Sequence, residues 1–353
     1  MKMLFVGPYR QPDEWGQMSR NIIKSILTVE DISLTTRPLF LSSVILNQNG
    51  FDPKILACEA NKQQEYDVVI QHCLPNFMIQ DGNFKTNIGI TSIETKGNNE
   101  WSNNLELMDS IFVSTEAEKN CVADHLQGRV HVIGGCIDAV EQDNSPPNPR
   151  FSFYCLAGHL ETKTGVLPLL QAFMSEFHVN EAVTLVLQTS NVGLAQQLVK
   201  ETAETLGIYG SPMYPHIHIV EQNEEDSVHK NCHCLIDTSV TRGFKVDVAK
   251  ALSYGNTPIV LEGSGMDEYV NNNNGWVVDS TESILVCPDR PLVNVFTGKE
   301  TCLVPDKVHL KHCMREAFDN KSFSNEKSNN AKDCSKLFSN ERQGELIKEI
   351  LQV

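Results

Sequence analysis

The chain has 353 residues, and its 45 Asp and Glu against 29 Lys and Arg give it a formal net charge of −16 at pH 7. This charge repels polyanions, so the composition disfavours nucleic acid and anionic lipid as partners. The length is typical of about two domains, and no apolar run approaches the ~20 residues that span a bilayer. The first apolar run is short and ends before Pro8, which predicts a buried strand rather than a secretory signal, and therefore a cytoplasmic protein.

Eleven cysteines are scattered along the chain, and only Cys232 and Cys234 stand close together. None has the paired CxxC spacing, so we expect reduced and mostly buried thiols. The histidines of the motif HIH and of the pair His309 and His312 are interpreted as surface residues of strands and helices. The sequence therefore predicts no metal site.

The first half of the chain alternates short apolar runs with helical periodicity, which is typical of βαβ units. The run MLFVG predicts a first strand, and residues 16–27 predict a helix because Ile22, Ile23 and Ile26 fall on one face. Further strands are expected at YDVVIQH, TNIGITS and DSIFVST, a helix at about residues 115–125, and a last strand at RVHVIGG. Residues 1–140 are thus predicted to form one α/β domain.

A stretch without periodicity, DAVEQDNSPPNPR, follows and predicts a linker at residues 141–150. The alternation then resumes, with predicted strands at FSFYCLAG, VTLVLQTS, IHIVEQ, CHCLIDTS and TPIVLEG. Helices are expected at about residues 166–177, 192–206 and 247–254. We predict a second α/β domain at residues 151–310 and a polar helical tail at residues 311–353.

Ligands of parallel α/β sheets bind beyond the carboxyl ends of the strands, which directs attention to the loop TRGFKVDVAKALSYG. It places Arg242, Gly243 and Phe244 directly before a helix, whose free N–H groups and partial positive charge attract phosphate. If the helix is continuous, Lys250 lies two turns from Arg242 and roughly on the same side. The plainer interpretation is that Lys250 is a solvated lysine and Gly243 only a connection.

At this loop the sequence resembles the family 4 glycosyltransferases of the GT-B fold. Their donor motif has a Ser, then Glu-Gly-Phe-Gly, a helix with a second Glu, and a Gly-x-Pro turn. The positions in register with it are Ser239, Gly243, Phe244, Ala251, Gly255 and Pro258. GHLETKTGVLPLLQAF resembles the segment that opens the family's donor domain, with Gly158 and Gly165 aligned, and GPYRQPDEWGQMSRNII resembles its first glycine-containing loop. The resemblance covers most of residues 1–280.

This resemblance implies a GT-B architecture, in which two Rossmann-like domains with parallel sheets face each other across a cleft and a C-terminal helix crosses back. It also implies transfer of a hexosyl or pentosyl group from a nucleotide-diphosphate sugar to a hydroxyl acceptor such as a glycan. The nucleotide sugar, held by the second domain, is a substrate and not a cofactor. The family usually retains the stereochemistry and needs no metal, since basic groups and helix N-termini neutralise the leaving diphosphate.

The chain departs from the family at its charged positions. Arg242 stands at the first acid, which touches the donor sugar, and Lys250 at the second, which holds the ribose hydroxyls. A lysine cannot accept hydrogen bonds from hydroxyls as a carboxylate does. His159 replaces the family's phosphate-binding arginine and Thr164 its lysine. The candidate donor-binding residues are Gly158, Lys163, Thr164, Arg242, Gly243, Phe244 and Lys250.

Two explanations of these departures remain open. The basic side chains could contact the diphosphate or an acidic group on an unusual donor. Alternatively, catalysis has been lost and the chain is a non-catalytic GT-B-like protein that binds a glycan or a protein partner. A weaker alternative, sugar transfer to modified bases of viral DNA, is disfavoured by the net charge of −16.

Candidate residues of the first domain follow predicted strands. Gly16 lies in a loop whose backbone could approach a substrate, with Trp15 and Gln17 beside it on the acceptor side. His72 ends the strand YDVVIQH and is the candidate for contact with the transferred sugar, and Glu94 is a catalytic candidate on the acceptor side. The ordinary alternative for both side chains is that each caps a neighbouring helix.

Overall fold

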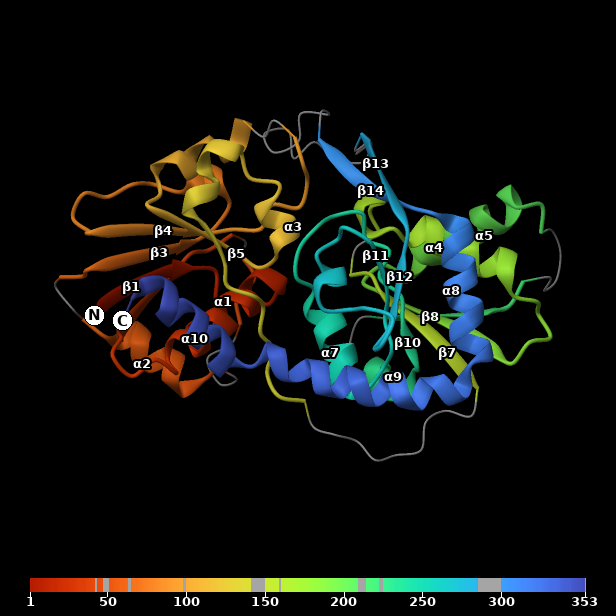
Figure 1. Ribbon diagram of the computed structural model, residues 1–353. Helices are drawn as coiled ribbons and strands as arrows, with labels where there is room; N and C mark the ends of the chain where they lie inside the picture. The colour runs from red at the N-terminus through yellow and green to blue at the C-terminus, as the bar shows by residue number, and fades with distance from the viewer. Residues whose placement is uncertain are drawn as a thin grey trace. The chain divides into compact units, whose positions relative to one another are not determined.

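The computed structural model describes residues 1–41, 43–46, 51–62, 65–97, 100–140, 150–158, 160–208, 214–221, 225–284 and 300–352. The chain divides into two compact units (Figure 1). The first comprises Met1–Ala139 together with Leu337–Val353, and the second comprises Val140–Pro291 together with Gly298–Lys336. The predicted linker lies outside the described residues except for Arg150, and His159 also lies outside them.

The first unit is built on a six-stranded parallel sheet with the strand order β2-β1-β3-β4-β5-β6. Its strands are β1 (Lys2–Gly7), β2 (Ser33–Pro38), β3 (Val68–His72), β4 (Thr86–Ile90), β5 (Ser110–Val113) and β6 (Val130–Val132). Its helices are α1 (Glu14–Ile26), α2 (Pro53–Ala60), α3 (Glu116–Lys119) and α10 (Asn340–Leu351). The described strands therefore occur where apolar runs predicted them, with β2 and α2 in addition.

The C-terminal helix α10 packs on α1 in the core of this unit. Ile347 of α10 and Ile22 of α1 belong to the same buried cluster as Phe5 of β1. A side chain at Gly344 would place its Cβ only 2.5 Å from the carbonyl oxygen of Ser25, so the two helices approach each other closely because α10 has a glycine there. The end of the chain is thus an integral part of the first unit.

Two helix boundaries differ from the sequence prediction. Helix α1 begins at Glu14, two residues early, because the Asp13 carboxylate caps it by accepting a hydrogen bond from the Gly16 N–H at 2.8 Å. The helix predicted at residues 115–125 ends at Lys119. There the N–H of Val122 bonds the Lys119 carbonyl at 3.0 Å, and this three-residue spacing tightens the chain into a turn.

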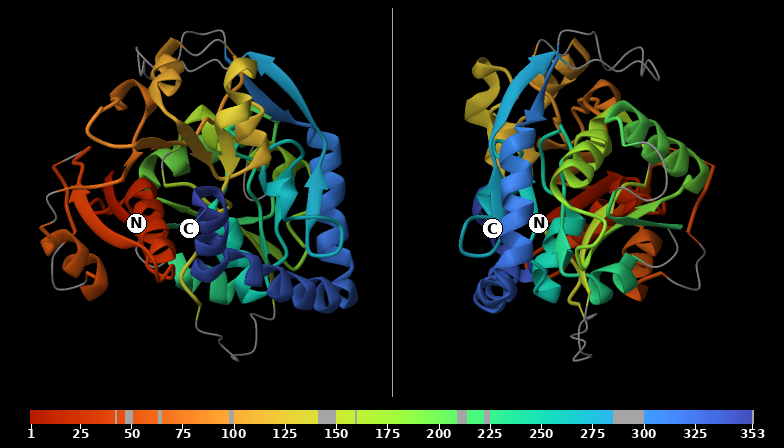
Figure 2. Two further views of the ribbon diagram at one scale, coloured as in Figure 1. Left: turned by 60° about the vertical axis from the view of Figure 1, so that its left-hand side comes forward. Right: turned by 90° about the vertical axis from the view of Figure 1, so that its right-hand side faces the viewer.

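The second unit has a four-stranded parallel sheet with the order β10-β7-β8-β9. The bridge between Ile236 and Ile259 continues it into the parallel pair β11–β12. The strands are β7 (Phe151–Leu156), β8 (Val183–Thr189), β9 (His216–Glu221), β10 (Cys234–Leu235), β11 (Ile259–Leu261) and β12 (Trp276–Val278). An antiparallel hairpin, β13 (Ser280–Ile284) with β14 (Thr301–Pro305), follows and was not predicted (Figure 2).

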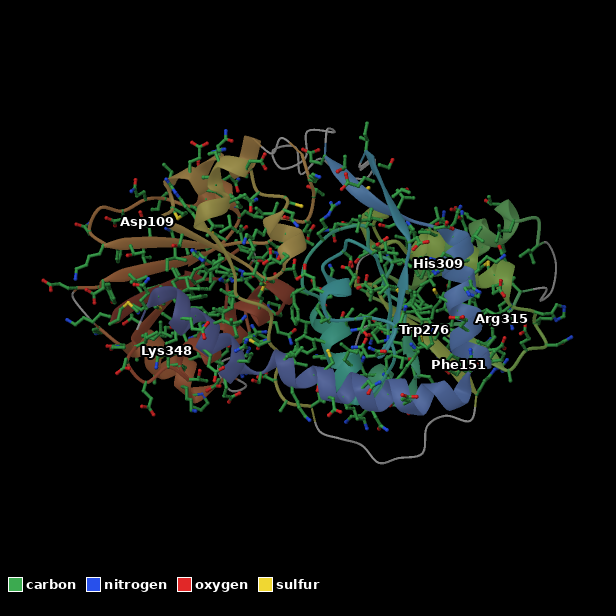
Figure 3. The ribbon with its side chains drawn as sticks, viewed as in Figure 1. Asp109, Phe151, Trp276, His309, Arg315 and Lys348 are labelled. Atoms are coloured by element: carbon green, nitrogen blue, oxygen red, sulfur yellow. The ribbon has the colours of Figure 1, made fainter. Side chains whose placement is uncertain are left out.

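The helices of the second unit are α4 (Val166–Glu176), α5 (Val192–Thr205), α6 (Glu225–Asn231), α7 (Val246–Tyr254), α8 (Lys307–Asp319) and α9 (Lys321–Cys334). Side chains of α4, α5 and α8 fill the core against one face of the sheet. Arg315 of α8 clamps this side, because its guanidinium binds Glu176 at 2.9 Å and lies 4.4 Å from the centre of the Phe177 ring (Figure 3). Arg315 thus ties α8 to the end of α4.

Two further findings concern the described residues alone. Their ten cysteines are all free thiols. None of their helices combines the length and apolar character needed to cross a membrane.

Candidate functional site

The loop after β1 is fixed against the first turn of α1. Arg20 donates hydrogen bonds to the carbonyl oxygens of Tyr9 and Gln11, at 2.9 and 2.7 Å. A Cβ on Gly16 would lie 2.0 Å from the Gln11 carbonyl oxygen, so only glycine fits there. The close approach expected at Gly16 is therefore one with this loop's own backbone. Gln17 lies beside it, half-buried in the first turn of the helix.

His72, the last residue of β3, is fully buried at the carboxyl edge of the first sheet. Its ring stacks on Trp15 with 5.1 Å between ring centres, and its Nδ1 lies 2.6 Å from the hydroxyl oxygen of Ser19. Burial lowers the pKa of His72 to about 3, so the imidazole is neutral at physiological pH. Its Nε2 is buried without a hydrogen-bond partner among the described residues.

The structure thus brings two predicted residues, Trp15 and His72, together and adds a third that sequence reasoning missed. Ser19 follows Trp15 by four residues, and this helical spacing puts both side chains on the same face of α1. The four-residue spacing of Trp15 and Ser19 is the signal that the sequence contained. It identifies His72 as their partner only once the strand order is known.

A second carboxylate lies near the Glu94 loop. Glu94 is half-buried, whereas Glu118 is fully buried and accepts hydrogen bonds from the Ser92 hydroxyl at 2.6 Å and the Ser114 N–H at 2.9 Å. Burial raises the pKa of Glu118 to about 7. Glu118 therefore ties together the segments that follow β4 and β5. The spacing Thr115-x-x-Glu118 is a helix capping box, a signal that the sequence contained.

In the second unit, the loop that follows β7 is held to the loop that follows β10. The N–H of Val240 bonds the Lys163 carbonyl at 2.9 Å. Gly165 has a φ of +68°, and a Cβ there would lie 1.8 Å from the Thr238 carbonyl oxygen. The Thr164 hydroxyl donates to the carbonyl of Glu161 at 2.7 Å, within the same turn.

Two other predicted residues of this first loop have different surroundings. The carbonyl oxygen of Gly158 accepts a hydrogen bond from the N–H of Ser190 at 3.1 Å, which links the ends of β7 and β8. The Lys163 amine is partly exposed and lies 4.0 Å from the Glu161 carboxylate, at the limit of an ion pair.

Arg242 lies in the loop after β10 and is almost fully buried, with 6% of its side chain exposed. One guanidinium nitrogen, Nη2, donates to the carboxylate of Glu282 on β13 at 2.6 Å. The other, Nη1, is buried and has no partner among the described residues. Gly243 has a φ of +133°, which favours glycine, and its N–H bonds the Ser264 carbonyl at 2.8 Å. The Phe244 ring packs on Tyr269, 5.7 Å between ring centres.

Lys250 lies in the second turn of α7 and is 16% exposed. Its amine is 3.5 Å from the carboxylate of Asp226, in the first turn of α6. Because α7 begins at Val246, close to the predicted start at residue 247, Arg242 lies before this helix, and the two bases are not carried by one continuous helix. The left-handed Gly243 separates the two positions.

Each base that stands at an acid position of the resembled motif therefore holds a carboxylate from another segment. Arg242 holds Glu282, and Lys250 holds Asp226. Both carboxylates keep about half of their side chains exposed, at 46% and 58%. Since α6 follows β9 and the Arg242 loop follows β10, these pairs belong to segments that leave the carboxyl edge of the sheet.

A buried polar network lies beneath Lys250. The Tyr154 hydroxyl is 2.7 Å from Nδ1 of His229, and Asn256 donates to this hydroxyl at 2.9 Å and to the His229 carbonyl at 2.7 Å. Burial lowers the pKa of His229 to about 3. The network joins α6, β7 and the end of α7, so it fixes the position from which Lys250 reaches Asp226.

The second unit also has a hollow of about 770 Å³ between β12, α8 and α9. Trp276 lines it, and so does His309, whose ring nitrogen lies 3.0 Å from the Asp279 carboxylate (Figure 3). Within the described ranges, no three His, Cys, Asp or Glu side chains are grouped so as to hold a metal ion.

No family model matches the chain, and no curated protein matches it. Solved structures do match. A glycosyltransferase from Rickettsia africae ESF-5 has 14% identity and a TM-score of 0.62, covering 99% of this chain and 98% of that one. Anabaena HepE in complex with UDP has 14% identity and a TM-score of 0.61, with 100% of both chains covered.

The pneumococcal O-GlcNAc transferase GtfA, in complex with UDP and GlcNAc, has 13% identity and a TM-score of 0.58 over 81% of this chain. This chain spans only 56% of the length of GtfA. All three are glycosyltransferases of the GT-B type, and at these identities the likeness establishes the fold. The chain thus has the expected α/β fold with two Rossmann-like units and parallel sheets.

Proposed function

We propose that this protein is a glycosyltransferase that moves a sugar from a nucleotide-diphosphate donor to a hydroxyl acceptor. The observation that carries the proposal is the pairing of both replaced positions with carboxylates, Arg242 with Glu282 and Lys250 with Asp226. A protein that had lost its donor site would have no need to hold a half-exposed carboxylate at each of these two positions. The UDP bound in HepE and GtfA supports a uridine nucleotide as the first donor to test.

In this proposal, Asp226 replaces the acid that Lys250 displaced. A carboxylate can accept hydrogen bonds from two neighbouring hydroxyls, as the ribose of a nucleotide requires. The Lys250 amine, 3.5 Å away, holds this carboxylate in place. The ribose contact is thus transferred from α7 to α6 while its chemistry is kept.

The diphosphate would be neutralised by cationic side chains without a metal or another cofactor. Lys163 reaches out from a short turn after β7, and the unpartnered Nη1 of Arg242 offers a charged donor after β10. The two loops are joined by the backbone hydrogen bond between Val240 and Lys163, so both cationic side chains extend from loops that are tied together. Charge neutralisation of the departing diphosphate is the main catalytic demand of such a transfer.

In the first unit, His72 is proposed to contact the transferred sugar through Nε2. The imidazole is neutral, held in place by Ser19 and Trp15, and has a free nitrogen with no partner in the described part of the chain. Glu94 is proposed on the acceptor side, next to a loop that Glu118 fixes. Retention of the sugar's stereochemistry, as in the resembled family, belongs to the same proposal.

A second candidate is a non-catalytic protein with the same fold that binds a glycan or a protein. One observation favours it: Arg242 and Lys250 already have carboxylate partners, so both pairs could serve stability alone. The two candidates differ in nucleotide-sugar binding, which only the enzyme needs.

The test is thermal unfolding with UDP, GDP, ADP, CDP and dTDP and their sugars. A ligand at 100 times its Kd stabilises the folded chain by about 2.7 kcal/mol, which raises Tm by several degrees. We expect a selective rise with one base, lost in Asp226→Asn and kept in the matched variant Asp333→Asn, whose acid is exposed on α9. No rise with any nucleotide, from a folded protein, would support the non-catalytic candidate.

A further inference from the structure

The hairpin β13–β14 brings a carboxylate to the loop that follows β10 in the second unit. The hairpin continues from β12 (Figure 1). Glu282, the middle residue of β13, accepts a hydrogen bond from Nη2 of Arg242 at 2.6 Å. A segment that no sequence motif pointed to thus supplies a charged group to one of the proposed donor-binding loops.

The hairpin is attached to this loop through its second strand. Glu282 lies opposite Leu303 in the antiparallel register, and directly opposite residues project from the same face of a strand pair. Leu303 is buried in the core of the unit, and its N–H donates to the Val240 carbonyl at 2.9 Å. Val240 comes two residues before Arg242, so the backbone fixes the strand that carries Glu282 to the loop that carries Arg242.

The contact between Arg242 and Glu282 leaves part of each group unused. A guanidinium and a carboxylate frequently form two parallel hydrogen bonds. Here the structure gives one, from Nη2 to Oε1. Nη1 is buried without a partner among the described residues, and Oε2 has only a long contact, 3.5 Å from the Thr301 hydroxyl oxygen. The pair therefore offers one free hydrogen-bond donor and one nearly free acceptor.

The two side chains also differ in burial. Arg242 is 6% exposed, whereas Glu282 is 46% exposed. A counter-ion that served only to neutralise a buried guanidinium would gain more from being buried and doubly bonded beside it. Glu282 instead keeps about half of its side chain open to a ligand, while Arg242 holds its position.

The unused atoms define the chemistry of a ligand. Nη1 requires an acceptor, for which an anionic oxygen is best, and a carboxylate oxygen requires a donor such as a hydroxyl. A sugar joined to a phosphate has both, because hydroxyls of the ring lie close to the phosphate oxygens. A free nucleoside diphosphate ends in a phosphate instead, which has no sugar hydroxyl to donate and is repelled by a neighbouring carboxylate.

We propose that Glu282 recognises the sugar of the donor by accepting a hydrogen bond from a ring hydroxyl near the phosphate that Arg242 binds. This inference rests on the proposed function and adds a specificity residue to it. The donor sugar would be one with a free hydroxyl close to its anomeric carbon. Glu282 would favour the intact sugar nucleotide over the diphosphate that remains after transfer, and so would assist release of that product.

The experiment is calorimetric titration of the full chain with a nucleoside diphosphate and its sugar nucleotide. The probes are UDP and UDP-glucose, or the pair that the thermal screen selects. The measured quantity is the ratio of the two affinities, because a general loss of stability weakens both alike. We expect Glu282→Gln to weaken binding of the sugar nucleotide relative to the diphosphate by about tenfold, since a hydrogen bond to a charged group is lost.

A matched variant controls for the removal of a carboxylate elsewhere in the unit. Glu204→Gln removes the acid of the Lys200 ion pair on α5, where Glu204 is 39% exposed, and should keep the ratio within about twofold. An unchanged ratio in Glu282→Gln would overturn the inference and leave the proposed function standing. If the natural protein binds neither probe, the proposed function fails, and the inference fails with it.

Monodeoxy forms of the donor sugar test the same contact on the natural protein. One of them should bind about tenfold more weakly than the parent sugar nucleotide, because the carboxylate then has no hydroxyl to bond. Glu282→Gln should bind this deoxy donor and the parent nearly equally. If every deoxy donor keeps the same relative affinity in both proteins, Glu282 does not contact the sugar.

Discussion

The hydroxyl oxygen of Ser19 lies 2.6 Å from Nδ1 of His72, and the opposite ring nitrogen is buried without a partner in the described part of the chain. Ser19 therefore directs the imidazole at a fixed angle, with Trp15 stacked on its face. The proposed contact of His72 with the transferred sugar rests on this held ring and its one unsatisfied nitrogen.

Ser19→Ala is expected to destabilise the protein by about 1–3 kcal/mol, because it leaves a buried imidazole nitrogen unsatisfied. Chemical denaturation measures this loss. In Ser175→Ala, whose hydroxyl bonds only to the carbonyl one turn earlier on an exposed helix face, the change should stay within about 0.5 kcal/mol. Equal losses of unfolding free energy in both variants would mean that the contact between Ser19 and His72 stabilises the protein no more than an exposed hydroxyl does.

Lys250→Glu alone should destabilise the chain and weaken nucleotide binding, because the new carboxylate would lie next to Asp226. The exchange Lys250→Glu with Asp226→Lys restores opposite charges and returns the acid to the position it has in the resembled motif. Unfolding free energies of the four proteins form a double-mutant cycle with an expected coupling of about 0.5–3 kcal/mol.

The same four proteins test the ribose contact. If a carboxylate is needed there, UDP should bind the exchanged protein better than either single variant. An exchanged protein that is stable but binds nucleotide no better than the single variants would argue that this ion pair only supports the fold.

Arg242→Gln and Glu282→Gln separate anion binding from a structural role. If the guanidinium holds the diphosphate, Arg242→Gln should lower the affinity for UDP by tenfold or more, by about 1.4 kcal/mol. Glu282→Gln should leave that affinity unchanged or raise it, since it removes the competing carboxylate at 2.6 Å. Calorimetric titration gives both values. Equal losses in the two variants would contradict a direct anion contact.

Gly165→Ala should prevent stable folding, because its Cβ would lie 1.8 Å from a backbone oxygen and the residue has a φ of +68°. Gly207→Ala is the matched control, with a similar φ of +70° and no atom within 4 Å of the added Cβ. It should cost only the strain of a left-handed residue, about 1–2 kcal/mol. Circular dichroism and thermal unfolding compare the two. A folded Gly165→Ala protein of similar stability would show that the two loops can separate.

Glu118 makes stability depend on pH. Its pKa rises from 4.5 to about 7 on folding, so the folded chain keeps a proton that the unfolded chain loses. This contribution is complete below about pH 4.5 and is lost as the pH rises through 7, with a slope of at most about 1.4 kcal/mol per unit. Relative to the natural chain, Glu118→Gln should therefore gain stability across this range.

The two buried histidines change the stability with pH in the opposite direction. Because the pKa values of His72 and His229 fall to about 3, their contribution is present above about pH 6.5 and is lost as the pH falls. They are the same in both proteins, so the difference between the two pH profiles isolates Glu118. A difference that does not change with pH would show that Glu118 titrates normally.

The sequence predicted the two sheets well because their strands are short β-branched runs, such as VVIQH and VTLVLQT, that lie between helices. The hairpin β13–β14 was missed because its first strand, STESI, is polar and mostly exposed, so it lacks an apolar signal. Helix α3 was predicted too long because the helical periodicity of the sequence continues beyond Lys119, where capping and turn contacts end the helix.

The sequence pointed to two residues that the structure places in contact. His72 and Trp15 were named as candidates and lie together, because a strand end and the start of a neighbouring helix meet at one sheet edge. The partners of Arg242 and Lys250 could not be predicted, since Glu282 and Asp226 come from other segments and no local spacing links them. A motif comparison cannot identify acids that the tertiary structure brings next to the motif from other segments.

The most direct test of the account is the release of nucleoside diphosphate from the donor whose base stabilises the chain. The assay uses the full chain with water or simple glycans as the acceptor. We predict release above the blank, lowered in His72→Gln by about 10²-fold or more. A donor that binds tightly, yet releases no diphosphate with any hydroxyl acceptor, would contradict the enzyme and leave a nucleotide-sugar-binding protein.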